Sequence, residues 1–264
     1  MAFEFLLNLI YSLYAMSTQP DSVPAMTRQQ KEYTSTRSGF SAYRHMTVGE
    51  SSLAFLVYYE LVNFCFSNVA GLAGYGLRAL FYRKLFERCG KRPAIGKGVL
   101  LRNPAQVQIG DKLLLDDYAV LDAHDNGKIK IGGYVSIGRY TTVAAKGGRV
   151  VLKNGVNIGS YCRIATHSKI EIGESTLVAA YCYIGPGNHQ QGDQETPLIA
   201  RDMDIKGGVK IGKHCWLGTR VTVLDGVTIG DRAIIAAHSF VKDDVPAGAV
   251  VAGIPAKILR YQDG

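Results

Sequence analysis

From Ile95 onward, an aliphatic residue recurs at every sixth position of the chain. Units of six begin with Ile, Leu or Val, often followed by Gly, as in IGDKLL from Ile109, IGGYVS from Ile131 and IGKHCW from Ile211. An internal repeat of this kind decides the fold. Three units make one coil of a triangular parallel β-helix, with position one filling the interior. The repeat therefore predicts a mainly β protein.

The fifth position of each unit is also selected, because it is nearly always small. We expect it to point inward, into the tighter space beside a corner of the triangle. Gly at position two suits a bend that brings backbones close or needs a positive φ. An aliphatic residue often stands two places before the unit that opens a coil, as alternation on a strand would give. The fifth-position residues are Val135, Thr141, Val156, Cys162, Thr176, Cys182, Cys215, Val221, Ala233 and Ser239.

Three of the five cysteines fall in this small inward slot, where Cys behaves as a compact hydrophobe. Roles for Cys162, Cys182 and Cys215 as metal ligands or nucleophiles are therefore not expected. The chain has an odd number of cysteines and no CxxC pair, so it indicates neither a zinc site nor a disulfide framework. A reducing compartment, the cytoplasm, is the plain interpretation.

The six-residue rhythm stops at IGPGNH, residues 184–189, and resumes at Val209 after a polar insertion, residues 190–208. Loops held by a rigid scaffold carry function more often than the scaffold does. His189 falls at position six, against a corner and next to this break. The other repeat histidines fall at position four, which we expect to point outward from a strand into solvent. They are His124, His167, His214 and His238.

A metal site is the alternative interpretation of these histidines. His124 and His167 are predicted to share a face with His189. The γ-class carbonic anhydrases bind metal with histidines on a scaffold of this kind, but two of their three ligands come from one short stretch. No closely spaced histidine pair exists here. We therefore expect no metal, and His189 is the candidate catalytic residue.

Residues 1–50 are predicted to form a short helix and a polar linker. The apolar start, residues 1–16, lacks a basic first region and a small-residue cleavage pattern, so a secretory signal is not indicated. It is also shorter than the roughly 20 apolar residues that a spanning helix needs. Residues 17–50 are polar and show neither a helical nor a strand period, which indicates a linker or an arm.

Residues 51–94 join an apolar helical stretch to a basic cluster. Residues 53–80 are apolar on nearly all sides, although Glu60 interrupts them. Two interpretations remain: helices that pack on the main domain or on another subunit, and a segment, residues 53–92, that lies on an anionic membrane. A spanning helix is the least favoured. The basic residues are Arg78, Arg83, Lys84, Arg88, Lys91 and Arg92.

The net charge of +8 indicates a polyanionic partner: nucleic acid, an anionic membrane or a phosphate-rich small molecule. Nucleic acid is not expected, because the clustered cations adjoin an apolar segment and lack an interleaved aromatic platform.

The repeat domain, residues 95–264, resembles the hexapeptide-repeat acyltransferases, above all sugar O-acetyltransferases of the maltose and galactoside type and polysaccharide or lipopolysaccharide acetyltransferases. The resemblance lies in the GNH before the insertion, the tryptophan in IGKHCWLG and the ending DDVPAGAVVAGIPAKILR. It implies a left-handed parallel β-helix. We expect an N-terminal helical segment before this domain and a short C-terminal helix at its end. The resemblance also implies a homotrimer with active sites between protomers.

The resemblance assigns roles to individual residues. His189 matches the general base that takes the proton from an acceptor hydroxyl, and an imidazole suits this role because its unperturbed pKa is about 6.5. Asn188 either helps to place the substrate or fills its small slot. A partner for the other imidazole nitrogen is expected: Asp193, Glu195 or a backbone carbonyl. The residues matched to binding of acetyl-CoA are Trp216, Gly218, Ala236, Ser239, Lys242 and Lys257, with Arg260 as a further cation for its phosphates.

The function implied is an acetyl-CoA-dependent O-acetyltransferase that acts on a sugar hydroxyl in surface polysaccharide or lipopolysaccharide biosynthesis. Its acceptor is a saccharide, a nucleotide-sugar or a lipid-linked sugar, met in the cytoplasm or at the inner membrane face. The alternative is a non-catalytic β-helix that serves as a scaffold or assembly protein at the membrane, because the repeat alone fixes only the fold.

Overall fold

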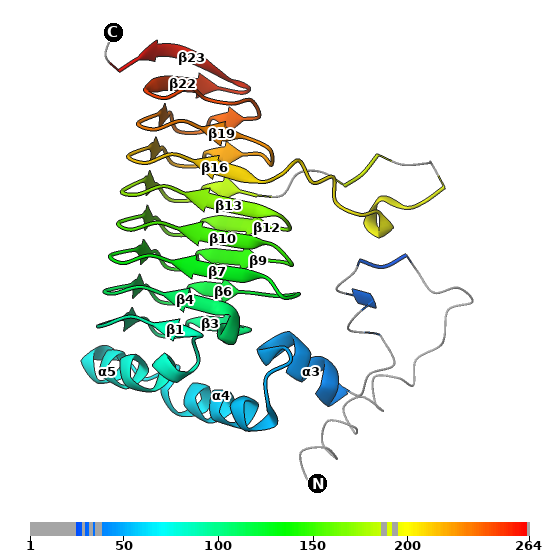
Figure 1. Cartoon of the computed structure of the whole chain (residues 1–264), viewed down its shortest axis with the longest axis vertical. Coiled ribbons are helices and arrows are strands. Elements are labelled where there is room, and N and C mark those ends of the chain that lie inside the picture. The colour runs from blue at the N-terminus through cyan, green and yellow to red at the C-terminus, as the bar shows by residue number, and fades with distance from the viewer. Residues whose placement is uncertain are drawn as a thin grey trace.

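A computed structural model of the chain describes residues 25–27, 30–31, 34, 39–185, 189–191 and 195–262. Asn188, Asp193 and the helix expected within residues 1–16 lie outside the described residues. The described chain forms a β-helix that three helices close at one end, while a long arm leaves one corner (Figure 1).

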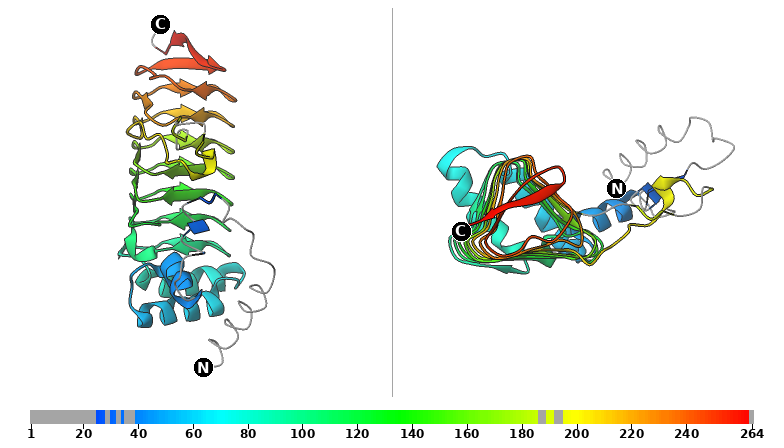
Figure 2. Two further views of the ribbon diagram at one scale, coloured as in Figure 1. Left: turned by 90° about the vertical axis from the view of Figure 1, so that its right-hand side faces the viewer. Right: turned by 90° about the horizontal axis from the view of Figure 1, so that it is seen from above.

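Three parallel sheets form the sides of the β-helix, and the view along its axis is triangular (Figure 2). Sheet A contains β1 (Arg88–Cys89), β4 (Val107–Ile109), β7 (Lys128–Ile131), β10 (Arg149–Leu152), β13 (Lys169–Ile172), β16 (Val209–Ile211) and β19 (Thr228–Ile229). Sheet B contains β2 (Ala94–Ile95), β5 (Leu114–Leu115), β8 (Ser136–Ile137), β11 (Asn157–Ile158), β14 (Leu177–Val178), β17 (Trp216–Leu217), β20 (Ile234–Ile235), β22 (Ala249–Gly253) and β23 (Ala256–Tyr261). Sheet C contains β3 (Leu100–Arg102), β6 (Val120–Asp122), β9 (Thr142–Ala145), β12 (Arg163–Thr166), β15 (Tyr183–Ile184), β18 (Thr222–Val223) and β21 (Phe240–Val241).

The interior consists of the two positions that the repeat selects for size. Position-one residues stack on their equivalents in the next coil; Ile137, for example, pairs with Ile158, and Ile158 with Val178. All ten fifth-position residues named above are buried. The predicted β-helix is therefore confirmed, and its six-residue period is that of the left-handed form.

Position four lies in a turn, not on a strand as expected. Most strands of sheet B contain only positions six and one, so the chain turns at positions three and four. Tyr134, His214 and His238 adopt positive φ of 58°, 57° and 62° there. Gly at position two serves close approach instead, because a Cβ on Gly138 would lie 2.6 Å from the main chain of Gly159. Of the two reasons considered for these glycines, close contact between coils is the one that applies.

A ladder of four tyrosines runs along the corner between sheets B and C. Tyr118, Tyr140, Tyr161 and Tyr181 all have positive φ, and their ring centroids are 5.0–5.1 Å apart in nearly parallel stacks. Arg220, from the next coil, places its guanidinium 5.5 Å from the centroid of Tyr181. The tyrosine ladder thus links consecutive coils on the outside, as the aliphatic stacks do inside.

The expected C-terminal helix is wrong. Residues Ala256–Tyr261 form β23, which pairs antiparallel with β22. The turn between them contains Gly253, whose φ of 104° few other residues adopt, and Pro255, which has no N–H to continue a helix. The last coil also leaves a row of unpaired backbone groups at the edge of sheet B, and β23 supplies their partners.

Three helices close the other end of the β-helix: α3 (Gly39–Val48), α4 (Leu53–Phe66) and α5 (Gly71–Phe81). Helix α3 forms inside the segment expected to be a linker. Its Thr47 carbonyl accepts a hydrogen bond from Asn103 of the first coil, and Tyr43 donates one to Glu60 of α4 at 2.5 Å. These tertiary contacts stabilise α3, although its sequence lacks the apolar period of an amphipathic helix. Among the described residues, no helix is long and apolar enough to cross a membrane.

Arg78 does not belong to the exposed basic cluster in which the sequence places it. Its side chain is buried, 1% exposed, between α4, α5 and the first coil. The guanidinium donates to the carbonyl oxygens of Ile95, Phe66 and Val69 at 2.8, 3.0 and 2.7 Å. Arg78 therefore fastens the two helices to the β-helix.

Candidate active site

The arm between β15 and β16 projects far from the corner after sheet C (Figure 1). Its two chains pair: His189 and Met203 form an antiparallel bridge, and Gln190 N–H donates to the Asp202 carbonyl at 2.9 Å. At its base, the N–H of Lys206 donates to the carboxylate of Asp225 at 2.5 Å, and Asp225 is buried. The arm is thus held by the β-helix at its base and by its own backbone further out.

His189 is exposed on this arm, and its Nδ1 lies 3.0 Å from the main-chain oxygen of Arg201. A carbonyl oxygen only accepts hydrogen bonds, so a neutral ring in this contact carries its proton on Nδ1. The lone pair is then on Nε2. Of the orienting partners considered from the sequence, the backbone carbonyl is the one that the described residues supply.

The expectation that the position-four histidines are solvated is wrong for His124. This histidine is buried, and its Nδ1 lies 2.9 Å from Oδ1 of Asp122, the last residue of β6. That hydrogen bond raises the pKa of His124 above its ordinary value, and burial only partly opposes it. The sequence signal, an Asp-x-His that begins at the end of a strand, is present but too short to be distinctive.

The other three repeat histidines lie on the turns of the β-helix and not on the arm. His214 and His238 are exposed, and His167 is half-buried beside the base of the arm. Among residues 39–185, 189–191 and 195–262, no group of three His, Cys, Asp or Glu side chains is arranged to hold a metal ion.

Trp216 lies on a different face from His189. It is 51% exposed on β17 of sheet B, between Leu177 and Ile234 of the neighbouring coils. The same outward row continues through Val250 to Arg260 on β23. The structure therefore brings Trp216 and Arg260 onto one face, and within one protomer it does not bring them to the His189 arm.

Of the other residues matched to binding of acetyl-CoA, some lie on sheet B with Trp216 and others do not. Gly218 and Ala236 follow consecutive strands of sheet B, and a Cβ on Gly218 would lie 2.6 Å from the main-chain nitrogen of Ala237. Ser239 fills an inward slot, and its buried hydroxyl has no hydrogen-bond partner among the described residues. Lys257 is exposed on β23. Lys242 follows sheet C and forms an ion pair with Asp243 at 3.0 Å.

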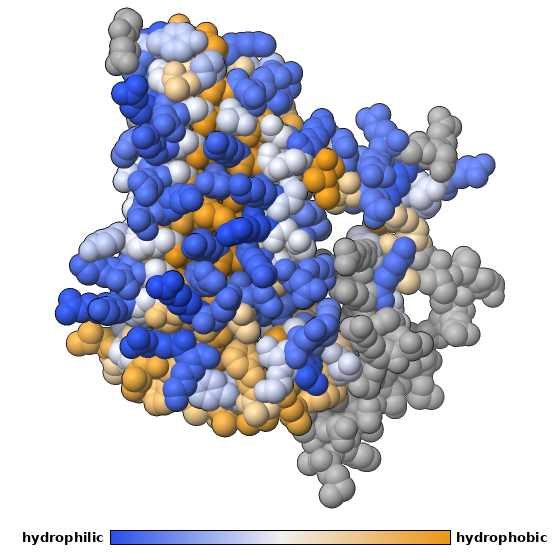
Figure 3. Space-filling view, in the orientation of Figure 1, coloured by the Kyte–Doolittle hydropathy of each residue, from blue (hydrophilic) through white to orange (hydrophobic). Residues whose placement is uncertain are grey.

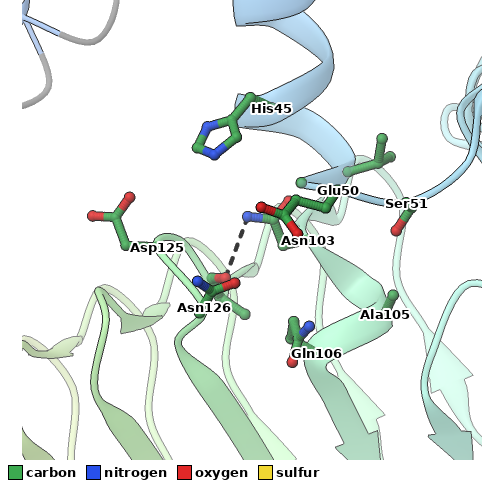
Figure 4. Close-up of a pocket in the computed structure, with 11 residues that line it drawn as sticks. His45, Glu50, Ser51, Asn103, Ala105, Gln106, Asp125 and Asn126 are labelled. Carbon is green, nitrogen blue, oxygen red and sulfur yellow. Dashed lines mark hydrogen bonds between the residues drawn. The ribbon is translucent and has the colours of Figure 1, made fainter.

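A polar cavity of about 280 Å³ lies elsewhere, between the end of α3 and the corner after β3 and β6 (Figure 4). His45 projects into it from α3, facing Asp125 of the β-helix. Asn103 is buried in its wall: its Nδ2 donates to the Ala123 carbonyl at 3.3 Å, whereas its Oδ1 has no partner within the described part of the chain. No sequence motif marks this cavity, because its residues come from α3 and two separate coils.

The chain is similar to known proteins in both sequence and fold. The family model of the bacterial transferase hexapeptide (six repeats) matches residues 208–243. A putative lipopolysaccharide biosynthesis O-acetyl transferase, WbbJ of Escherichia coli, is 33% identical over 143 residues, which cover 52% of this chain and 73% of that protein. The chain belongs to the hexapeptide-repeat acyltransferases. The family that the GNH, the tryptophan and the GIPAK ending suggested is thus confirmed.

Two other similar proteins match different shares of the chain. A probable acetyltransferase of Mycobacterium tuberculosis is 32% identical over 160 residues, 61% of this chain, and the chain spans only 53% of that relative's length. The crystal structure of the polySia-specific acetyltransferase NeuO has a TM-score of 0.56 at 22% identity, covering 66% of this chain and 81% of NeuO. The likeness to NeuO supports the fold alone.

Proposed function

We propose that this protein transfers an acetyl group from acetyl-CoA to a sugar hydroxyl during the synthesis of a surface polysaccharide or lipopolysaccharide. The observation that carries the proposal is the imidazole of His189, held through Nδ1 by the Arg201 carbonyl on an exposed arm. Relatives named as acetyltransferases, one of them in lipopolysaccharide biosynthesis, support the reaction class.

The orientation of His189 suits a general base. Nε2 would accept the proton of the acceptor hydroxyl while its oxygen forms a bond to the thioester carbon of acetyl-CoA. Collapse of the resulting tetrahedral species breaks the C–S bond, and the leaving thiolate takes the proton from the imidazolium. The products are the O-acetylated sugar and CoA, and His189 returns to its neutral state. Asn188, next to the base, would help to place the acceptor.

Sheet B offers the features that an acyl-CoA needs. The small side chain of Ala236 permits the close approach of a pantetheine arm. At Gly218 and Ser239 the contact would come from the main chain, because the missing Cβ of Gly218 faces the next coil and the side chain of Ser239 is inward. Trp216 offers an exposed aromatic surface, and Lys257 and Arg260 offer cations for phosphate groups. Lys242, paired with Asp243, is the weaker candidate for this role.

We infer that the complete site lies between protomers, because Trp216 and His189 belong to different sides of one protomer. A homotrimer would bring the sheet B face of one copy to the arm of the next. The donor is a cytoplasmic metabolite, so the reaction would occur in the cytoplasm. A lipid-linked acceptor would be met at the inner membrane face, through contact by residues 53–92.

The experiment is acetyl transfer from radiolabelled acetyl-CoA to a panel of nucleotide-sugars and lipid-linked glycans. His189→Ala should lower kcat on the order of 10²–10⁴-fold, as expected for a removed general base, while quenching of Trp216 fluorescence by acetyl-CoA persists. His238→Ala, an exposed histidine at a turn, is the matched control and should retain activity. Full turnover by His189→Ala would rule out the proposed base. Absence of any response of Trp216 to acetyl-CoA would favour the non-catalytic scaffold.

A further inference from the structure

Helices α4 and α5 present apolar side chains to solvent on their outer side. In α4 these are Leu53, Val57, Leu61 and Phe64, which recur at helical spacing and form one stripe. In α5 they are Leu72 and Leu80, two turns apart with Gly76 between them. Phe64 and Leu72 are 91% and 90% exposed. The space-filling view shows a hydrophobic base at this end of the molecule (Figure 3).

The inner side of the same helix already has its packing partners. Leu56, Tyr59 and Val62 of α4 are buried in the core cluster that continues into the first coils, and Tyr59 donates to the Leu101 carbonyl at 2.7 Å. At about 100° per residue, the outer stripe lies on the opposite side of the helix from these three. The sequence left two interpretations open: helices packed on the protein, or a segment that lies on a membrane. In α4 the inner side packs on the first coils while the outer side stays exposed, so the two interpretations do not exclude each other. Glu60 is the one exposed acidic residue of α4 beside this stripe, and it accepts a hydrogen bond from Tyr43 of α3. The apolar character of the rest of the outer side is not explained by packing within the described chain.

Exposed cations border this apolar base. Five lie between the end of α5 and the start of sheet B, against a single acidic residue, Glu87. Arg78 is not among them, because its charge is buried in the carbonyl cluster. The five are Arg83, Lys84, Arg88, Lys91 and Arg92.

We propose that this end of the protein docks on an anionic membrane, with the outer stripes of α4 and α5 in the interface and the five cations against lipid headgroups. An apolar helical face edged by Lys and Arg is the arrangement that binds such a surface without spanning it. Both helices lie across the end of the β-helix, so the β-helix would stand away from the bilayer (Figure 2). The charge complementarity selects a membrane over a second copy of this chain, whose same face would carry the same cations.

The coils set the height of the candidate site above this base. The arm follows β15, which is separated from β3 of the first coil by four strand spacings in sheet C. At about 4.8 Å per spacing, His189 would stand roughly 20 Å above the first coil. This part of the inference rests on the proposed function: the acetylated sugar would be one held some distance from the lipid, within an extended lipid-linked glycan.

The test uses sedimentation of the full-length protein with vesicles of phosphatidylcholine, with and without phosphatidylglycerol. The wild type should sediment with the anionic vesicles only. Phe64→Glu with Leu72→Glu, and separately Arg83→Glu with Lys84→Glu, should each weaken binding by about tenfold or more. Leu259→Glu, at a leucine that is 66% exposed at the far end of the β-helix, is the control and should bind as the wild type does.

Two outcomes would overturn the inference. One is unchanged vesicle binding by the Phe64→Glu, Leu72→Glu protein. The other is loss of an oligomer by that protein, with no vesicle binding by any variant, which would make the face a contact between copies. Activity on a soluble acceptor separates this inference from the proposed function, because the docking variants should retain it. If no acceptor is acetylated while vesicle binding follows the expected order, the proposed function fails and the docking surface stands.

Discussion

The Nδ1 atom of His189 lies 3.0 Å from the main-chain oxygen of Arg201, across the two chains of one arm. The register of the arm sets this contact, since His189 also bridges to Met203. No side-chain substitution at Arg201 removes the carbonyl that orients the ring. The proposed base therefore depends on the folding of the arm, which brings the Arg201 carbonyl to the imidazole ring.

The tautomer of His189 follows from this contact. When the ring is neutral, Nδ1 should be protonated and Nε2 should be bare, because the carbonyl can only accept. Long-range ¹H–¹⁵N correlation spectra distinguish the two ring nitrogens, and His189→Gln identifies the signals. An Nε2–H tautomer at neutral pH would contradict the expected geometry and leave no lone pair for the acceptor proton.

The Asp122–His124 pair should make the folded state more stable in acid than in alkali, over the range in which His124 titrates. Its pKa is raised in the folded protein, so the native state binds more protons than the unfolded state, and stability falls as pH rises. The contribution should be complete below about pH 6.5, the ordinary histidine value, and lost as pH rises through the folded pKa.

Urea unfolding across that pH range checks this prediction. His124→Gln should flatten the pH dependence relative to the wild type, whereas His214→Gln, exposed at an equivalent turn, should leave it unchanged. An equal slope in His124→Gln and the wild type would show that the pair is not linked to folding.

The tyrosine ladder should contribute to stability through its ring faces, not its hydroxyls. Tyr161 stacks on Tyr140 and Tyr181, at 5.0 and 5.1 Å. Tyr161→Ala removes both stacks and should cost about 1–3 kcal/mol, since each aromatic pair contributes roughly 0.5–1.5 kcal/mol. Tyr161→Phe keeps the stacks and should lie within about 0.5 kcal/mol of the wild type. Thermal and urea unfolding measure both, and an equal loss in the two variants would assign the effect to the hydroxyl.

The sequence predicts the parts of this fold that repeat. Ile137, Ile158 and Val178 obey the same size rule, and each is reinforced by the next coil, so local pattern and tertiary packing agree. Phase also separated His189 from the other histidines. It failed at the turns: the positive φ at Tyr134, and the burial of His124 beside Asp122, depend on how a coil bends at its corners, which the six-residue period does not specify.

A different limit applies at both ends of the β-helix. Helix α3 has no apolar period, and it forms because Thr47 and Tyr43 find partners in the first coil and in α4. Strand β23 forms because an open sheet edge is available to it. Neither partner is close in sequence, so neither element could be inferred from its own residues. For the candidate site, the sequence names a backbone carbonyl among the expected partners of His189, but it does not identify Arg201 as the residue that supplies it.

Arg78 should be the residue on which the helical base depends most. Its guanidinium donates to three carbonyl oxygens, and its Cζ lies 5.4 Å from the centroid of the Tyr75 ring. Arg78→Met fills much of the same space but leaves these buried acceptors short of donors. The expected loss in free energy of unfolding is roughly 2–4 kcal/mol, because each unsatisfied buried group costs about 1–3 kcal/mol and some would recover a water.

Urea unfolding followed by circular dichroism measures this loss, and hydrogen exchange at α4 and α5 shows whether the helices detach first. Arg78→Lys should recover only part of the stability, since an ammonium lacks the planar fork that reaches three carbonyls at once. Lys84→Met removes an exposed cation nearby and should change stability by no more than about 0.5 kcal/mol. If Arg78→Met were as stable as Lys84→Met, the three carbonyls would have other donors, and Arg78 would not fasten the helices to the first coil.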